Sequence, residues 1–233
     1  MKTSGNTILI TGGSAGIGFE IAKLFSEKGN KVIITGRNAD RLQDAARQLK
    51  NVIPFQGDVT IEDDVERLVA EVKSNHPDLN ILINNAGAAV YYTLVAEANA
   101  YEKASREIIT NYLSIIRLTE KLLPLLSGKE SAAVVNVTSV AAFRPFAALP
   151  TYAASKAALH SYTESLRETI NADLGVEVYE LIPPLVNTAF SAEIGGRENG
   201  IPPQEVAEEL LLAFEKKQYL VPVGEMGKEI VKL

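Results

Sequence analysis

The stretch Thr11-Gly-Gly-Ser-Ala-Gly-Ile-Gly18 follows the short apolar run Thr7-Ile-Leu-Ile10 and decides the fold of this 233-residue chain. After the glycines, apolar residues recur at helical spacing from Phe19 to Phe25, and Gly29 ends the pattern. The order is therefore strand, glycine-rich turn and helix. Small residues in such a turn let backbone N–H groups and the helix N-terminus approach a phosphate closely.

Several known motifs compete for this turn. The dinucleotide fingerprint with glycines at offsets zero, two and five does not fit, because Gly13 is followed by two non-glycine residues. The phosphate loop of nucleotide hydrolases fails because no lysine follows Gly18. A serine-hydrolase elbow centred on Ser14 needs several strands before it, whereas only eleven residues precede Gly12. The spacing Gly12-x-x-x-Gly16-x-Gly18 thus predicts a variant dinucleotide-binding turn, with a purely structural tight turn as the alternative.

Composition narrows the class of protein. The chain is 46% hydrophobic and 22% charged, which suits a globular domain. Its net charge is −6 and no dense Lys/Arg run occurs, so we expect neither nucleic acid nor a membrane surface as a partner. The absence of cysteine excludes disulfides and thiol chemistry. No apolar stretch reaches the length of a signal peptide's apolar region or a membrane span, so a cytoplasmic protein is expected.

Strand-like and helix-like patterns alternate along the whole chain, with no repeat or linker. This alternation predicts one α/β domain over residues 1–233, a doubly wound parallel sheet of about seven strands with helices on both faces. The expected strands are residues 7–10, 31–35, 52–56, 79–83, 132–137, 176–182 and 219–223. The expected helices after the first are residues 41–49, 62–75, 100–126, 152–173 and 203–217, and residues 189–200 are expected to form a mobile flap.

The end of the second strand bears on cofactor choice. Residues 31–35 are followed by Gly36 and Arg37, and no acid stands there. In a dinucleotide fold an acid at this point binds the ribose 2′-hydroxyl, whereas an arginine accommodates a 2′-phosphate. Arg37 therefore predicts NADP rather than NAD, unless it is only an exposed loop charge.

Tyr152 and Lys156 form the candidate catalytic pair. Residues four apart share one face of a helix, so the two side chains are expected to point the same way. An ammonium beside a phenol favours the phenolate, so we expect a lowered Tyr152 pKa. Ser139, at the end of the strand 132–137, is placed to hold a carbonyl oxygen against that phenol. The layout indicates proton transfer to a carbonyl or alcohol, whereas a solvated helix surface is the alternative.

Other polar residues fall where strands end or where a helix tolerates them poorly. Asn84-Asn-Ala-Gly87 follows the fourth strand and Pro183 through Thr188 the sixth. Asn111 lies inside the predicted helix 100–126, although its amide competes for backbone hydrogen bonds there, so it is a candidate site residue. The carboxyl ends of parallel strands meet at one crevice, where such sheets bind ligands.

Taken together, these residues resemble the short-chain dehydrogenase/reductase family, of the single-domain, Rossmann-like type. The likeness covers essentially the whole chain, and the offset of thirteen positions from Ser139 to Tyr152 fits it. The motifs that carry it stand in the family's order: Thr11-Gly-x-x-x-Gly-x-Gly18, Asp58, Asn84-Asn-Ala-Gly87, Asn111, Ser139, Tyr152-x-x-x-Lys156 and Pro183 through Thr188.

The resemblance implies a role for each matching residue. Tyr152 would be the general acid in reduction and the base in oxidation, Ser139 would polarise the substrate carbonyl, and Lys156 would hold the nicotinamide ribose and lower the Tyr152 pKa. Asn111 would hold a water that links Lys156 to solvent. The implied cofactor-binding residues, with no metal, are Gly12, Ser14, Ile17, Gly18, Arg37, Asp58, Val59, Asn85, Ala86, Gly87, Tyr152, Lys156, Pro183, Val186 and Thr188.

Two positions depart from the family pattern. Pro184 replaces the more frequent glycine, which, together with the Ser-Ala-Gly-Ile-Gly turn, is similar to the DltE-like bacterial reductases found with D-alanyl-lipoteichoic acid operons. Ala15 stands where a basic residue would favour NADP, so that preference depends on Arg37 alone.

The function that follows is an NADP-dependent carbonyl reductase or alcohol dehydrogenase. The alternative is a dinucleotide-binding sensor or regulator without turnover, which would not need the intact Asn111, Ser139, Tyr152 and Lys156 set. The expected pocket wall is mostly apolar: Val90, Val140, Ala141, Phe143, Phe146 and Leu185, with Arg144 nearby. The family resemblance implies a homodimer or homotetramer, and His160 is expected at the helix surface or in a subunit contact.

Overall fold

A seven-stranded parallel sheet forms the centre of the molecule in the computed structural model, which describes residues 1–232. The strand order is β3-β2-β1-β4-β5-β6-β7, which confirms the predicted doubly wound α/β fold. The strands are β1 (Thr7–Thr11), β2 (Lys31–Gly36), β3 (Val52–Gln56), β4 (Ile81–Asn84), β5 (Ala132–Val137), β6 (Val176–Ile182) and β7 (Leu220–Pro222).

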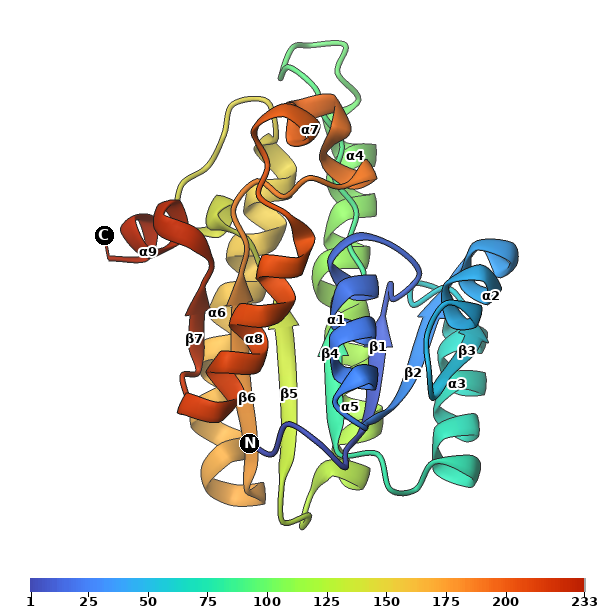
Figure 1. Cartoon of the computed structure of the whole chain (residues 1–233). Coiled ribbons are helices and arrows are strands. Elements are labelled where there is room, and N and C mark those ends of the chain that lie inside the picture. Colours follow the sequence, from blue (N-terminus) through green and yellow to red (C-terminus); the bar gives the residue numbers. More distant parts are fainter. Residues whose placement is uncertain (233) are drawn as a thin grey trace.

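Helices cover both faces of the sheet (Figure 1). The face with α1 and α8 lies in front in that view, and α5 and α6 lie behind the strands. The helices are α1 (Gly16–Glu27), α2 (Ala39–Arg47), α3 (Glu62–Asn75), α4 (Ala100–Ile108), α5 (Ser114–Leu126), α6 (Pro150–Leu174), α7 (Gly196–Asn199), α8 (Pro203–Lys216) and α9 (Gly224–Val231). No helix in residues 1–232 is long and apolar enough to cross a membrane.

The apolar strand sequences follow from burial on two sides. In β1, Ile8 and Ile10 join the core under α1 and α8, whereas Leu9 joins the core under α3, α5 and α6. Successive side chains of a strand point to opposite faces, so a strand covered on both faces is apolar throughout. Phe25 of α1 and Phe214 of α8 meet edge-on, with ring centroids 5.6 Å apart, and close the first core.

Three features of the local structure were not predicted from the sequence. The predicted helix 100–126 is interrupted by a π-helical turn, Ile109–Leu113, between α4 and α5. The predicted flap 189–200 contains a 3₁₀ helix, Ala189–Ile194, and the short helix α7. Helix α9, which packs Ile230 against Val140 and Ile182, was not predicted at all.

The sheet order reverses between β1 and β4. The strands that follow β1 in sequence, β2 and β3, lie on one side of it, and β4 to β7 lie on the other. The crossover connections therefore diverge at the carboxyl ends of β1 and β4, where open α/β sheets leave a crevice for a ligand.

Candidate active site

The glycine turn is shaped by close backbone packing. Gly12 has φ +68°, and the Gly12 and Gly13 amides both donate to the Thr35 carbonyl, at 2.8 and 3.2 Å. A Cβ on Gly18 would lie 2.4 Å from the Gly12 carbonyl oxygen, so only glycine fits there. At the start of α1, Ala15 provides no side-chain cap, which leaves amide donors for a phosphate group.

Asn85 ties the end of β4 to this turn. The Thr11 hydroxyl accepts hydrogen bonds from the Asn85 and Ala86 amides, both at 3.0 Å. The Asn85 side chain donates to the Thr11 and Gly12 carbonyls, at 2.9 and 3.2 Å. The Asn85 side chain, expected at a cofactor, is thus used to hold the two strand ends together.

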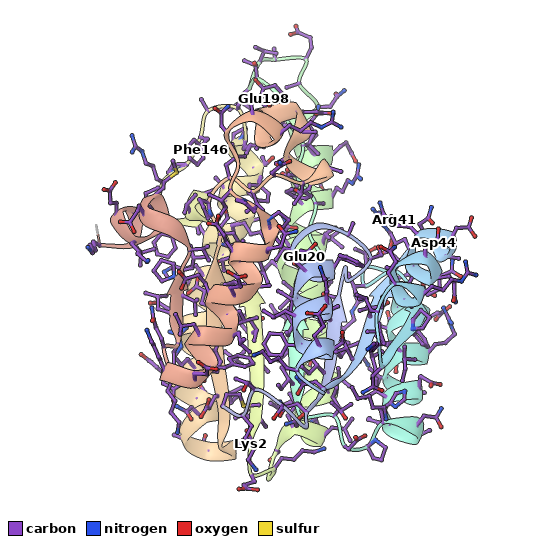
Figure 2. All side chains as sticks on the ribbon, viewed as in Figure 1. Lys2, Glu20, Arg41, Asp44, Phe146 and Glu198 are labelled. Atoms are coloured by element: carbon purple, nitrogen blue, oxygen red, sulfur yellow. The ribbon has the colours of Figure 1, made fainter. Side chains whose placement is uncertain are left out.

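A second arginine, Arg41, lies in the same region as Arg37, and the sequence did not identify it as a candidate site residue. Arg37 is 70% exposed and lies 3.9 Å from the Asp58 carboxylate. The Asn38 side chain caps α2 by accepting the Arg41 amide at 2.8 Å, and this places Arg41 in the first helical turn. Both Asn38 and Arg41 line an open hollow of about 480 Å³ beside the glycine turn, with Ser14 and Ala15 on its other wall. Figure 2 shows Arg41 and Asp44 at helix α2, and both line this hollow.

Tyr152 and Lys156 are buried on one face of α6. Tyr152 is 9% exposed and Lys156 4%, so the solvated-surface alternative is wrong. The Lys156 ammonium donates to the Val137 carbonyl at 2.7 Å and lies 5.9 Å from the centre of the Tyr152 ring. Ser139 lies two residues after the end of β5, and its hydroxyl accepts the Ala141 amide at 3.2 Å. The structure therefore brings the three predicted residues together.

The expected lowering of the Tyr152 pKa is wrong for this structure. Burial raises the pKa of Tyr152 to about 12, and hydrogen bonding with Ser139 opposes the rise only in part. Burial also lowers the pKa of Lys156 to about 8, against the charge of Glu180, which raises it. Removing both groups from water disfavours their charged forms, and here this effect exceeds the opposing effects of Ser139 on Tyr152 and of Glu180 on Lys156.

Asn111 lies in the π-helical turn and is fully buried. Its side chain donates to the Ala88 carbonyl and accepts the Ala88 amide, both at 2.8 Å, and it also donates to the Ser155 hydroxyl. A Cβ on Gly87 would lie 3.4 Å from Asn111 Oδ1 and 4.0 Å from Lys156 Nζ, so Gly87, Asn111 and Lys156 lie close together. Asn111 therefore holds the segment that follows β4 in place. This role of its amide was not predicted from the sequence.

A fully buried acid on α4 helps to hold the same segment. Glu107 accepts the Val90 amide at 2.7 Å, and its second carboxylate oxygen has no protein partner. Its negative charge contributes to the raised pKa of Tyr152. Helical spacing from Asn111 was the only sequence signal for Glu107.

The family profile described as short chain dehydrogenase matches residues 6–199. The chain belongs to the short-chain dehydrogenase family. This confirms the predicted resemblance and identifies the chain as an NAD(P)-dependent oxidoreductase. Hydride transfer to or from a nicotinamide cofactor is the general chemistry of short-chain dehydrogenases.

Two relatives extend the comparison. An oxidoreductase of Bacillus subtilis named DltE, itself uncharacterised, is 42% identical over 191 residues, which are 82% of this chain and 75% of DltE. An NADP-dependent 3-hydroxy acid dehydrogenase of Schizosaccharomyces pombe is 30% identical over 94% of this chain and 91% of its own. The first relative confirms the predicted similarity to the DltE-like branch.

Solved short-chain dehydrogenases share the fold. A Burkholderia cenocepacia enzyme in complex with NADP aligns with a TM-score of 0.87 at 27% identity, over 100% of this chain and 93% of its own. A 3-ketoacyl-(acyl-carrier-protein) reductase of Brucella melitensis complexed with NADH aligns with a TM-score of 0.84 at 26% identity, over 91% of each chain. Both forms of the cofactor thus occur among the structural relatives.

Two further candidate residues, Val186 and Thr188, lie in the segment after β6. A Cβ on Gly16 would lie 3.1 Å from the Thr188 side chain, so the segment after β6 reaches the glycine turn. Val186 pairs with Ile201 and is buried. Two expected wall residues lie elsewhere: Val140 packs on Ile182 and Ile230, and the Phe143 ring stacks 4.4 Å from that of His160.

Proposed function

We propose that this protein is an NADP-dependent carbonyl reductase or alcohol dehydrogenase in which Tyr152 is the general acid in reduction and the general base in oxidation. One observation carries the proposal: Tyr152 and Lys156 are buried side by side, next to Ser139, at the carboxyl ends of β4 and β5. A protein that only binds a dinucleotide has no need of a buried phenol there, so the sensor or regulator is the weaker candidate.

The chain's residues divide the chemistry between them. The bound nicotinamide supplies or accepts the hydride. The Ser139 hydroxyl and the Tyr152 phenol hydrogen-bond to the substrate oxygen, and the phenol gives it a proton during reduction. Lys156 orients the nicotinamide ribose, and its charge assists the phenol when the proton leaves. Asn111 keeps the Gly87–Ala88 backbone in place beside Lys156 and, in the proposed proton path, holds a water that links Lys156 to solvent.

The residues proposed to hold the cofactor lie in the glycine turn, after the ends of β2, β3, β4 and β6, and on α6. The small side chains and uncapped α1 N-terminus suit a pyrophosphate, and Arg37 suits a 2′-phosphate. The proposed set is Gly12, Ser14, Ile17, Gly18, Arg37, Asp58, Val59, Asn85, Ala86, Gly87, Tyr152, Lys156, Pro183, Val186 and Thr188.

The substrate is proposed to be a small carbonyl or alcohol with an apolar body. Exposed apolar side chains come from the three segments that surround the Tyr152 end of the crevice: Tyr91, Leu94 and Val95, then Phe146, then Phe190. The Phe190 ring lies 6.2 Å from that of Tyr152. An apolar wall of this kind selects by shape and hydrophobicity and discriminates weakly between related molecules.

Replacing Arg37 with alanine is expected to raise the Kd for NADPH by about 10- to 100-fold, since a charge-assisted contact to a phosphate contributes about 1.5–3 kcal/mol. The Kd for NADH, which lacks the 2′-phosphate, is expected to stay unchanged. Titration of nicotinamide fluorescence measures both constants. Arg47→Ala is the matched control, because Arg47 is an exposed arginine of α2 that pairs with Asp44. Equal losses for NADPH and NADH would refute the role of Arg37.

We further propose that residues 1–233 form one catalytic domain in a cytoplasmic homodimer or homotetramer. Ile109 and Leu113 support the assembly, because they expose 41% and 46% of their surface on the π-helical turn. Tyr112 on the same turn packs edge-on against Tyr162 of α6. Ile109, Tyr112 and Leu113 together form an apolar face on the helices beside the site. Sedimentation of the purified protein measures its oligomeric state and so tests the proposed assembly.

A further inference from the structure

A row of polar side chains crosses the centre of the sheet one layer below the candidate active site. Asn84, Asn136 and Glu180 are register partners on β4, β5 and β6, and each is at most 1% exposed. Asn84 donates to Asn136 at 2.9 Å, and Asn136 donates to the Thr163 hydroxyl of α6 at 2.9 Å. Glu180 is the acid of the row, and the residues two positions before and after it on the same face of β6, Val178 and Ile182, are apolar and buried.

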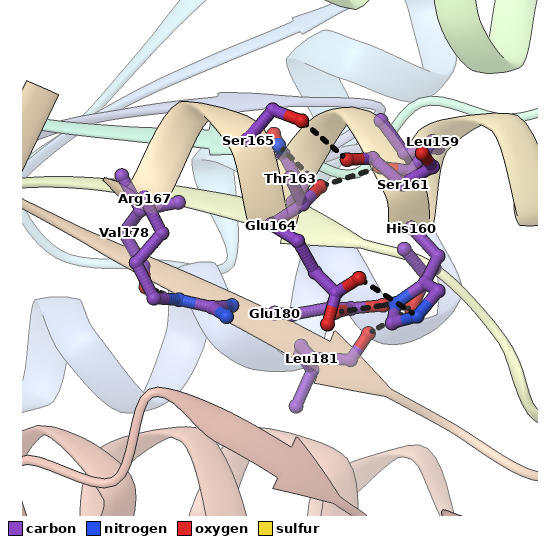
Figure 3. A network of polar contacts seen from close by, with 12 residues as sticks. Leu159, His160, Ser161, Thr163, Glu164, Ser165, Arg167, Val178, Glu180 and Leu181 are labelled. Atoms are coloured by element: carbon purple, nitrogen blue, oxygen red, sulfur yellow. Dashed lines mark hydrogen bonds and ion pairs between the residues drawn. The ribbon is translucent and has the colours of Figure 1, made fainter. Parts of the chain in front are cut away.

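His160 of α6 meets this acid, contrary to the expectation that it lies at the helix surface or in a subunit contact. Its Nδ1 lies 3.0 and 2.9 Å from the two oxygens of Glu180, and its Nε2 lies 3.6 Å from the carboxylate of Glu164 (Figure 3). Glu180 is fully buried, whereas the His160 side chain is 22% exposed and that of Glu164 58%. The imidazole thus connects a buried acid to the surface.

Glu180 is also connected to the candidate catalytic residues. The Thr138 hydroxyl donates to the Glu180 carboxylate at 2.8 Å, and Thr138 precedes Ser139 in the chain. Lys156 lies one helical turn before His160, and its ammonium is held on the carbonyl of Val137, the residue before Thr138. Contacts at Glu180 therefore act on the segment that carries both Ser139 and the partner of Lys156.

We propose that the Glu180–His160 pair is a positioning element of the active site, which fixes the Thr138–Ser139 segment and places a buried negative charge beside the turn of α6 that carries Lys156. The inference rests on the proposed function for the role of Lys156. Glu180 and His160 thus have a role although they take no direct part in the proposed reaction, in which neither touches substrate or cofactor.

The surrounding charges support this assignment. Burial raises the pKa of Glu180, and His160, Thr138 and Arg167 oppose the rise. Burial lowers the pKa of Lys156, and the charge of Glu180 raises it. The residues of β7 and α9 nearest this face, Leu220 and Ile230, are apolar and add no charge. Loss of the Glu180 charge therefore lowers the Lys156 pKa, so Lys156 loses its proton at a lower pH.

The first test follows Lys156 directly in the protein without substrate. Lysine labelled with ¹³C at Cε reports the ionisation of each ammonium by NMR, and the Lys156 signal is the one that Lys156→Met removes. Its titration midpoint is expected near pH 8 in the unmodified protein. In Glu180→Gln the midpoint is expected to fall by about one pH unit. His160→Gln removes the imidazole that stabilises the Glu180 charge from the exposed side. This variant is also expected to lower the Lys156 midpoint, but by less.

Glu164→Gln is the matched control, since it removes a carboxylate from the other nitrogen of the same imidazole without touching Thr138. It should leave the Lys156 midpoint in place. An unchanged midpoint in Glu180→Gln, or an equal shift in Glu164→Gln, would overturn the proposal. Because this measurement needs no turnover, it separates failure of this inference from failure of the proposed function.

The second test is a pH profile of kcat for NADPH oxidation with a carbonyl substrate. If the midpoint falls from about 8 to about 7, Glu180→Gln should lose about fivefold in kcat at pH 8 and little at pH 6. Thermal unfolding separates positioning from a structural role, because removing one partner of a buried pair can itself destabilise the fold. A kcat loss equal at all pH values and matched by a falling Tm would show that the pair is only structural.

Discussion

Replacing Tyr152 with phenylalanine is expected to lower kcat for carbonyl reduction by about 10²–10⁴-fold, the usual contribution of a positioned general acid. The substitution removes only the hydroxyl, and the ring stays packed against Ala141, Leu149 and Ala153. The Kd for NADPH is therefore expected to change little. Stopped-flow oxidation of NADPH measures turnover, and fluorescence titration measures binding.

Tyr92→Phe is the control for this experiment. Tyr92 also places a phenol near the site, where its hydroxyl hydrogen-bonds to that of Thr151 at 3.1 Å. Its loss should leave kcat within about fivefold, because the contribution of a single neutral hydrogen bond is only about 1 kcal/mol. Full activity in Tyr152→Phe would show that another group donates the proton, and the proposed mechanism would fail.

The direction of the pKa shifts determines the pH range of this reaction. With its pKa raised to about 12, Tyr152 keeps its proton throughout the neutral range and is ready to donate it. Lys156, with its pKa lowered to about 8, carries its charge below that pH and loses it above. Reduction is therefore expected to decline as the pH rises through about 8, well before the phenol ionises.

The sheet could be predicted because burial on both faces leaves a mark in the sequence. The apolar runs 132–137 and 176–182 predicted β5 and β6 with their observed bounds. The π-helical turn at Asn111 could not be predicted in this way, because it depends on the contact with Ala88, a residue 23 positions away. Helix α9 was missed because it is short and packs Ile230 into a small apolar cluster with Val140 and Ile182.

The same holds for the candidate site: features that depend on local geometry could be predicted, and features that depend on contacts between distant segments could not. The four-residue spacing of Tyr152 and Lys156 predicted their neighbourhood, since helix geometry is local. Their pKa values could not be predicted, because burial under the rest of the fold reverses the effect expected from the spacing alone. Glu180 did leave a signal: an acid at an inward-facing position of a buried strand needs a partner, and the partner is His160.

The glycine turn leads to the largest expected effect on folding. In Gly18→Ala the new Cβ would meet the Gly12 carbonyl oxygen at 2.4 Å and the Asn85 amide nitrogen at 2.5 Å. Neither atom is the free end of a flexible side chain, because Asn85 is held by two carbonyls. Overpacking of this kind is expected to reduce the free energy of unfolding by about 3 kcal/mol. In a domain of this size that corresponds to a fall in Tm of about 6–12 °C.

Gly57→Ala is the matched control, since a Cβ there would make only ordinary contacts at 3.5 Å and beyond, and its Tm should fall by less than about 2 °C. Thermal unfolding without cofactor isolates this effect. Gly18→Ala should also weaken NADPH and NADH binding alike, because the strain displaces the turn that holds the pyrophosphate common to both. This pattern is the opposite of that expected for Arg37→Ala, which separates the two cofactors. An unchanged Tm in Gly18→Ala would mean that the turn relaxes, and that Asn85 does not hold β1 and β4 together as the hydrogen bonds indicate.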